Sequence, residues 1–169
     1  NAPIYMKETC IVIAAYNEEK NIANVVNSLK QEGYNNLIVV DDGSKDNTFQ
    51  IAKQNGATAL KHIVNRGQGA ALQTGMTFAL KNGADFIVHF DADGQHDSKE
   101  IKSMLMPLQS KETEITLGSR FLKKQKIPFT RKLMLKGGII AVWAIHGIKL
   151  SDTHNGFRAF TKKAAKRII

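Results

Sequence analysis

The segment Asp91-Ala92-Asp93-Gly94-Gln95-His96-Asp97 places three carboxylates within seven positions, directly after an apolar run. Carboxylates this close repel one another unless solvent disperses the charge or a cation binds between them. Carboxylate and amide oxygens are hard ligands suited to Mg²⁺ or Mn²⁺. An Asp-x-Asp pair alone is weak evidence, because exposed loops often carry one. Its place after an apolar run nevertheless favours a divalent metal held by Asp91, Asp93 and Gln95.

The elements that must position this loop follow a regular alternation. Apolar side chains recur with the period of a helix between short apolar runs, as Ile22, Val25 and Leu29 do. Such alternation favours right-handed crossovers, and hence a single α/β domain with a mostly parallel central sheet and helices on both faces. The apolar runs predict strands at residues 10–14, 37–40, 57–62, 86–90 and 115–117.

Short polar residues mark the expected helix starts. Asp46 or Asn47 can cap a helix that ends before Gly56. Asp97, with Glu100 three positions later, forms a capping-box-like start to the next helix.

A polar pair follows each predicted strand. Because the carboxyl ends of parallel strands share one edge of a sheet, these pairs are expected to meet in one ligand site. An acidic pair at Asp41-Asp42 on the same edge strengthens the metal interpretation of Asp91 and Asp93. The pairs are Asn17-Glu18, Asp41-Asp42, Asn65-Arg66, Asp91-Asp93 and Ser119-Arg120.

The formal net charge of +9 is concentrated late in the chain. Residues 111–169 hold 14 Lys and Arg against three Asp and Glu, whereas residues 1–110 hold 10 against 12. Such a segment indicates an anionic partner or a merely solvated face. No motif that reads nucleic acid is present and aromatic residues are 7% of the chain, so we expect no nucleic-acid partner.

Cys10 is the single cysteine, which excludes an internal disulfide, favours a reducing compartment and predicts a buried, inert thiol. No basic-then-apolar leader is visible at the N-terminus. The apolar stretch 139–148 is shorter than the roughly 20 residues that a membrane-spanning helix needs. We therefore expect a soluble, cytoplasmic polypeptide.

Six motifs follow one another between about residue 9 and about residue 160. They are Ala15-Tyr16-Asn17-Glu18, Val40-Asp41-Asp42-Gly43-Ser44, Asn65-Arg66-Gly67-Gln68-Gly69, Asp91-Ala92-Asp93-Gly94-Gln95-His96, Gly118-Ser119-Arg120-Phe121, and Asp152 with Gly156-Phe157-Arg158. Their order and approximate spacing resemble the family 2 glycosyltransferases of the GT-A fold, and within them the dolichyl- or polyprenyl-phosphate sugar synthases. Any one motif is weak evidence, whereas six in order are strong.

The resemblance implies a donor site for a nucleotide-diphosphate sugar, linked to UDP or GDP. It places Asp91, Asp93 and Gln95 on the metal that contacts the donor diphosphate, with Asp93 also expected to be catalytic. A metal suits this chemistry, because it stabilises the negative charge that develops on the departing diphosphate. The residues implied in nucleotide-sugar binding are Ala15, Tyr16, Glu18, Asp41 or Asp42, Gly69 and Asp91.

The acceptor half lacks the Glu-Asp pair that often supplies a base in this family. After residue 110 the acidic residues are Glu112, Glu114 and Asp152. A phosphate monoester acceptor needs no base, because it is already anionic at neutral pH. It needs cations instead, and guanidinium groups grip phosphate oxygens in a bidentate manner. We expect Arg120 and Arg158, both also catalytic, to hold the acceptor phosphate together with Arg131 and Asp152, although a solvated role is equally open for Arg131.

The segment from Lys123 to Ile148 is basic and then apolar. It is expected to lie against an anionic membrane surface that delivers the lipid, which makes the protein peripheral at the cytoplasmic membrane face. A core helix containing Trp143 is the competing interpretation. We expect one catalytic domain over residues 1–169, truncated at its C-terminus, and the sequence leaves the oligomeric state unknown.

The expected function is therefore metal-dependent, inverting transfer of a sugar from a UDP- or GDP-sugar to a polyprenyl or dolichyl phosphate. A family 2 enzyme acting on a saccharide hydroxyl is the alternative. A phosphatase of the haloacid dehalogenase type shares the Asp-x-Asp-Gly pattern, but that motif normally lies near the start of its domain and precedes Thr or Val, whereas Gln95 follows here. A non-enzymatic module that binds nucleotide or membrane is the remaining rival.

Overall fold

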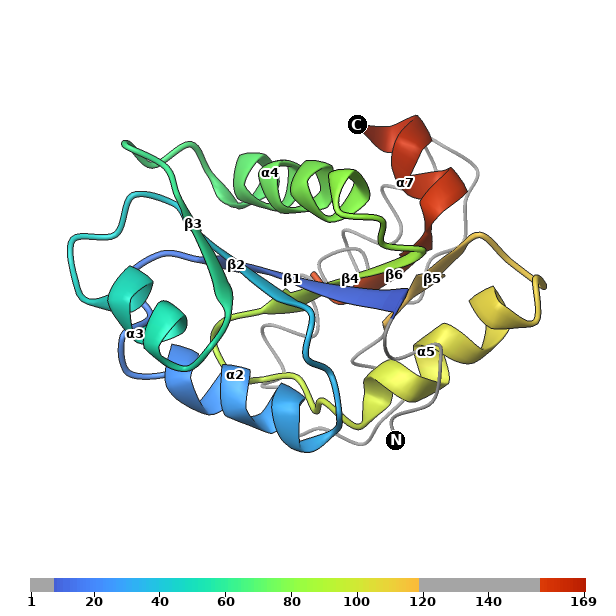
Figure 1. The fold of residues 1–169 in the computed structure, drawn as a ribbon, viewed down its shortest axis with the longest axis horizontal. Helices are drawn as coiled ribbons and strands as arrows, with labels where there is room; N and C mark the ends of the chain where they lie inside the picture. The colour runs from blue at the N-terminus through green and yellow to red at the C-terminus, as the bar shows by residue number, and fades with distance from the viewer. Residues whose placement is uncertain (1–7, 119–155) are drawn as a thin grey trace, which may run out of the picture.

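Alternating strands and helices build the chain, as a computed structural model that describes residues 8–118 and 156–169 shows (Figure 1). The strands are β1 (Thr9–Ala15), β2 (Leu37–Asp41), β3 (Thr58–Lys61), β4 (Phe86–Asp91), β5 (Ile115–Leu117) and β6 (Arg158–Thr161). The helices are α2 (Ile22–Gln31), α3 (Thr48–Gln54), α4 (Gln68–Lys81), α5 (Glu100–Gln109) and α7 (Lys162–Ile168).

The described strands form one sheet in the order β3-β2-β1-β4-β6-β5. β3, β2, β1 and β4 are parallel to one another, whereas β6 runs antiparallel to both β4 and β5. The carboxyl ends of the four parallel strands therefore meet at one edge. Because β6 is antiparallel to both of its neighbours, β5 runs in the direction of β4 and ends at the same edge.

Helices cover both faces of the sheet (Figure 1). Side chains alternate along β1, so that Ile11 and Ile13 face the core shared with α2 and α5, while Cys10 and Val12 face the core under α4 and α7. α4 lies close to the sheet at Gly75, where a β-carbon would overlap a methyl group of Val12. The predicted mostly parallel α/β sheet, covered on both faces, is confirmed.

The five predicted strands and the four helices between them are all present. β6 and α7 were not predicted. The apolar part of β6 is short, and its pairing partners on β4 lie about 70 residues earlier in the chain, which a local pattern does not reveal. A local signal did exist for α7, because Thr161 precedes it and its hydroxyl accepts a hydrogen bond from Ala164 N at 3.2 Å.

Two helix starts differ in detail from the expectation. Asn47 occupies the N-cap position of α3 without a capping hydrogen bond from its side chain, and Asp46 Oδ1 accepts a hydrogen bond from Thr48 N at 3.0 Å, which closes a turn before the helix. The residue before α5 is Lys99, and its backbone N–H donates to Asp97 Oδ1 at 3.0 Å. The carboxylate of Asp97 thus closes a turn with Lys99, which corrects the capping box expected with Glu100.

No helix in the described ranges is long and apolar enough to cross a membrane. The apolar stretch 139–148 and Trp143 lie outside those ranges.

Candidate active site

The first acidic pair closes β2 and is buried. The Asp42 carboxylate accepts hydrogen bonds from His62 Nδ1 at 2.7 Å, Arg66 N at 3.0 Å and Gly67 N at 2.7 Å. Burial alone would raise the pKa of Asp42, but these hydrogen bonds together lower it below its ordinary value. With Nδ1 as the donor, a neutral His62 ring accepts at Nε2 from the hydroxyl of Thr74 on α4, at 2.9 Å. Asp42 therefore anchors the loop between β3 and α4.

Asp41 has a different environment, although it is also fully buried. Its Oδ1 accepts a hydrogen bond from Ser44 N at 2.8 Å, and Lys61 Nζ lies 3.7 Å from Oδ2. Oδ2 has no hydrogen-bond donor among the described residues. One oxygen of Asp41 thus keeps accepting capacity beside a half-exposed lysine.

The loop after β1 is fastened to the segment after β2. Asn17 adopts a positive φ of 56°, and its backbone N–H donates to Ser44 Oγ at 2.9 Å. Glu18 N donates to Thr48 Oγ1 at 2.8 Å. Ala15 is buried at the end of β1, whereas Tyr16 is 43% exposed and available to a ligand. The structure therefore brings the predicted residues 15–18 and the acidic pair of β2 together at one edge.

The second acidic segment ends β4 at the same edge. Asp91 is partly exposed, and its carboxylate accepts hydrogen bonds from Gln68 Nε2 at 3.0 Å and from His96 Nε2 at 2.7 Å. A β-carbon added at Gly156 would overlap this carboxylate. Asp91 is thus in contact with the start of α4 and with the segment that leads into β6.

Asp93 and Gln95 are exposed on the loop that follows, and Gln95 N donates to Asp93 Oδ1 at 3.0 Å. Within the described ranges, no three His, Cys, Asp or Glu side chains gather as a set that could hold a metal ion. Mg²⁺ in substrate-phosphate sites is commonly bound by one or two carboxylates together with the phosphates. The oxygen chemistry of Asp91, Asp93 and Gln95 therefore fits such an ion, with the substrate completing the coordination.

Gly67 and Gly69 lie on either side of Gln68, the first residue of α4, and the two positions differ in backbone conformation. Gly67 has a positive φ of 90°, which favours glycine, and its N–H is held by Asp42. A β-carbon on Gly69 would meet nothing within 4 Å. The space beside Gly69 is open to a ligand.

His96 and Gln68 contact Asp91, and neither has a role predicted from the sequence. His96 contacts Asp91 and packs on Phe157, with ring centroids 5.1 Å apart. The signal in the sequence was the position of His96, which is five residues after Asp91 and therefore close enough to contact it across a short loop.

Of the four predicted acceptor residues, Arg158 lies in the described part of the chain and is exposed at the start of β6. It pairs in register with His89 of β4. Burial, and then the charge of Arg158, lower the pKa of His89 to about 4. Arg120, Arg131 and Asp152 lie outside the described residues, as does the basic segment around them.

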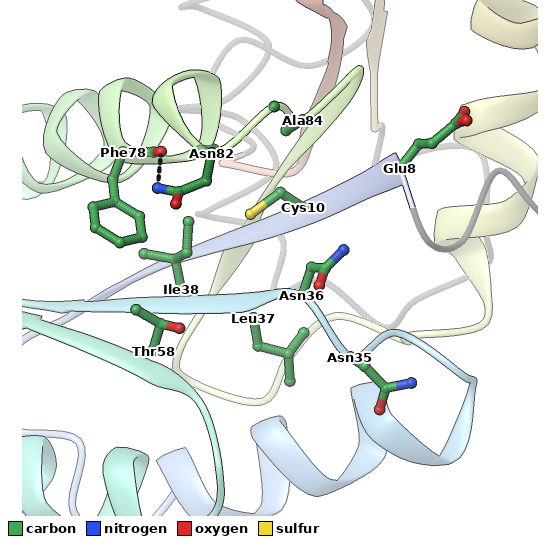
Figure 2. A pocket seen from close by; sticks show the side chains of 12 residues that line it. Glu8, Cys10, Asn35, Asn36, Leu37, Ile38, Thr58, Phe78, Asn82 and Ala84 are labelled. Carbon is green, nitrogen blue, oxygen red and sulfur yellow. Dashed lines mark hydrogen bonds between the residues drawn. The ribbon is translucent and has the colours of Figure 1, made fainter.

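A cavity of about 320 Å³ lies at the opposite edge, where the strands begin (Figure 2). Cys10 and Ile38 line it from β1 and β2, and Phe78 and Asn82 line it from the end of α4. Burial raises the pKa of the Cys10 thiol to about 12, which agrees with the buried, inert thiol expected from the sequence. The length of the strands separates this cavity from the acidic edge, so it does not belong to the candidate active site.

A family model and several relatives match this sequence. The family model described as Glycosyl transferase family 2 matches residues 10–169. A protein of Methanococcus voltae named UDP-N-acetylglucosamine–dolichyl-phosphate N-acetylglucosaminyltransferase is 39% identical over 92% of this chain and 70% of its own length. Polyprenol monophosphomannose synthase of Mycolicibacterium smegmatis is 27% identical over 96% of this chain and 64% of its own.

The fold also matches solved structures. Glucosyl-3-phosphoglycerate synthase of Mycobacterium tuberculosis, crystallised with Mn²⁺, UDP-glucose and phosphoglyceric acid, superposes with a TM-score of 0.72. It is 22% identical, and the match covers 92% of this chain and 57% of that one. The likeness establishes the GT-A fold, and the family match over nearly the whole chain makes this protein a member of glycosyltransferase family 2.

Proposed function

We propose that this domain transfers a sugar from a UDP- or GDP-sugar to a polyprenyl or dolichyl phosphate, with a divalent metal and inversion at the sugar carbon. The observation that carries the proposal is the meeting, at one sheet edge, of Asp91 with Gln68 from α4 and the glycine segment before β6. The names of relatives that act on dolichyl phosphate and polyprenol support the acceptor class.

The donor nucleotide is assigned to the wall formed by the β1 and β2 loops. The exposed ring of Tyr16 offers a stacking surface for the base, and Glu18 lies beside it on a loop fixed from the backbone. Asp41 or Asp42 is assigned to accept hydrogen bonds from base N–H or ribose hydroxyl groups, and of the two Asp41 carries the oxygen, Oδ2, that no described donor satisfies. Ala15, at the end of β1, and Gly69, where a β-carbon would meet nothing within 4 Å, are assigned to the same donor site.

The donor diphosphate is assigned to the second acidic segment. Asp91, Asp93 and Gln95 would hold Mg²⁺ or Mn²⁺, which when bound supplies a Lewis acid for the charge on the leaving diphosphate. Gln68 and His96 orient the Asp91 carboxylate toward the same edge. Asp93 is exposed on this loop, so its carboxylate is accessible to the ligand.

The acceptor phosphate is assigned to arginines. Arg158 is the first residue of β6 and follows Gly156, which lies against the Asp91 carboxylate. An acceptor phosphate held by Arg158 would therefore lie near the proposed metal. A phosphate monoester arrives already ionised, and a guanidinium holds it without a base. Arg120, Arg131 and Asp152 complete this proposal from outside the described residues, and the basic segment near them is assigned to an anionic membrane surface at the cytoplasmic face.

A melting experiment tests the donor site. Mn²⁺ together with UDP or GDP is expected to raise the melting temperature, because a ligand present at about 100 times its Kd stabilises the folded state by about 2.7 kcal/mol. Asp93→Ala is expected to abolish the shift. Asp97→Ala, which removes an exposed carboxylate of the same loop, is the matched control and is expected to keep it.

A transfer assay then tests the acceptor. Wild-type protein is given a panel of UDP- and GDP-sugars with a short polyprenyl phosphate, and lipid-linked sugar is measured. Product that requires Mn²⁺ supports the proposal. If neither nucleotide shifts the melting temperature with metal present, the donor-site assignment is wrong.

A further inference from the structure

We propose that His96 is a positioning residue that fixes the carboxylate of Asp91 for metal binding, and that Phe157 holds His96 in place. The inference deepens the proposed function and rests on its metal site at Asp91, Asp93 and Gln95.

The hydrogen bonds of Asp91 define one orientation of its carboxylate. His96 Nε2 lies 2.7 Å from Oδ2, and because a carboxylate oxygen only accepts, Nε2 carries the hydrogen. Gln68 Nε2 donates to Oδ1 from the other side, at 3.0 Å. A carboxylate oxygen can accept more than one partner, so these hydrogen bonds are compatible with a cation bound to the same carboxylate.

The His96 ring is itself immobilised by aromatic packing. Its centroid lies 5.1 Å from that of Phe157 and 5.7 Å from that of Phe90, and the two phenyl rings are 5.4 Å apart in an edge-to-face arrangement. The His96 side chain is only 10% exposed, and Phe157 is fully buried. This packing restricts the ring, and in the packed orientation Nε2 is directed at Asp91.

Gly156 forms the remaining wall. A β-carbon there would overlap the Asp91 carboxylate, so glycine permits the close approach of the segment that carries Phe157. This segment joins the sheet through β6, about 65 residues after Asp91 in sequence. Packing far along the chain thus sets the geometry of the first carboxylate of the Asp-x-Asp pair.

Outer partners of metal-binding side chains commonly change metal affinity 10- to 100-fold when they are removed. His96→Phe keeps an aromatic ring against Phe157 but deletes the donor to Asp91. His96→Gln keeps an N–H donor near the Nε2 position but loses the ring. The pair separates hydrogen bonding from packing.

The test measures Mn²⁺ affinity by titration calorimetry, with UDP or GDP present, whichever the wild type binds, and no sugar, so that no turnover is required. His96→Phe is expected to weaken Mn²⁺ binding at least 10-fold, with Gln recovering part of the loss. Phe157→Leu keeps both hydrogen-bonding partners and is expected to weaken binding by a smaller factor. Circular dichroism and the melting temperature without metal show whether each variant is folded.

The outcomes separate the two proposals. Wild-type protein that binds no Mn²⁺ with either nucleotide overturns the metal site itself, and the role of His96 with it. Wild-type binding together with equal Mn²⁺ affinity in a folded His96→Phe variant leaves the site standing and overturns the positioning role. If His96→Phe does not fold, His96→Ala, which also removes the donor, is measured in its place, and unchanged Mn²⁺ affinity in a folded His96→Ala variant overturns the positioning role as well.

Discussion

Two acidic segments lie at the same edge of the sheet, one after β2 and one after β4, and their carboxylates have opposite environments. The segment after β2 is buried, and the Asp42 carboxylate is occupied by two backbone N–H groups and by His62. In the segment after β4, Asp91 is partly exposed and Asp93 is exposed, and Asp91 is held by Gln68 of α4 and by His96 of the same loop. The first segment organises the backbone, whereas the second presents its carboxylates to solvent.

The difference shows that an acidic pair after a parallel strand can either have a structural role or remain accessible to a ligand. In the β2 pair, burial raises the cost of the charge and hydrogen bonds from the polypeptide offset it. In the β4 pair, the exposed Asp93 retains accepting capacity toward a ligand. The carboxylate of Asp42 therefore stabilises the fold, whereas that of Asp93 is left open to a ligand.

Asp42→Ala should have the largest effect on stability. It leaves the N–H groups of Arg66 and Gly67 and the ring of His62 without their acceptor, and a loss of about 3 kcal/mol in the free energy of unfolding is expected. Urea denaturation at neutral pH measures it. A loss no larger than that of Asp93→Ala would break the proposed contrast between the two segments.

His89 lies on β4, two residues before Asp91, and makes the stability of the fold depend on pH. Its pKa of about 4, against an ordinary value of 6.5, means that the unfolded chain binds a proton which the folded chain does not. Stability is therefore complete above about pH 6.5 and is lost as the pH falls toward about 4, by on the order of 2 kcal/mol at about pH 5.

His89→Phe should flatten this pH dependence, since phenylalanine cannot titrate and keeps a ring beside Phe160. Denaturant midpoints of both proteins across the window supply the measurement. Equal slopes for the variant and the wild type would show that another group is responsible.

Asp93→Ala should have the smallest effect on stability, because the side chain is exposed and its described hydrogen bond comes from Gln95 N, two residues away. A change within about 0.5 kcal/mol is expected. The urea series that includes Asp42→Ala gives the comparison. A loss similar to that of Asp42→Ala would mean that the β4 segment is also part of the structural framework.

The sequence allowed the parallel part of the fold to be predicted, because each strand and helix there has a local periodicity and a polar residue at its end. Asp41, Asp42, Asp91 and the loop at Tyr16 were expected at one edge for the same reason, and they lie there. The roles of these residues in binding stay predictions.

Partnerships between distant residues could not be predicted in this way. His62 reaches Asp42 across 20 positions, and Phe157 packs against His96 across about 60. Such contacts depend on the path of the backbone in space, which hydrophobic spacing does not encode. The antiparallel insertion of β6 between β4 and β5 was missed for the same reason.

The position of β6 also sets an order of assembly during synthesis. In the described part of the chain β5 pairs with β6, so residues 115–117 have no strand to join until residues 158–161 have been made. The parallel strands β1 to β4 require no such delay. A growing chain therefore carries the acidic loop after β4 before the segment that packs Phe157 on His96 has been made, and the loop should reach its full metal affinity only when β6 has entered the sheet.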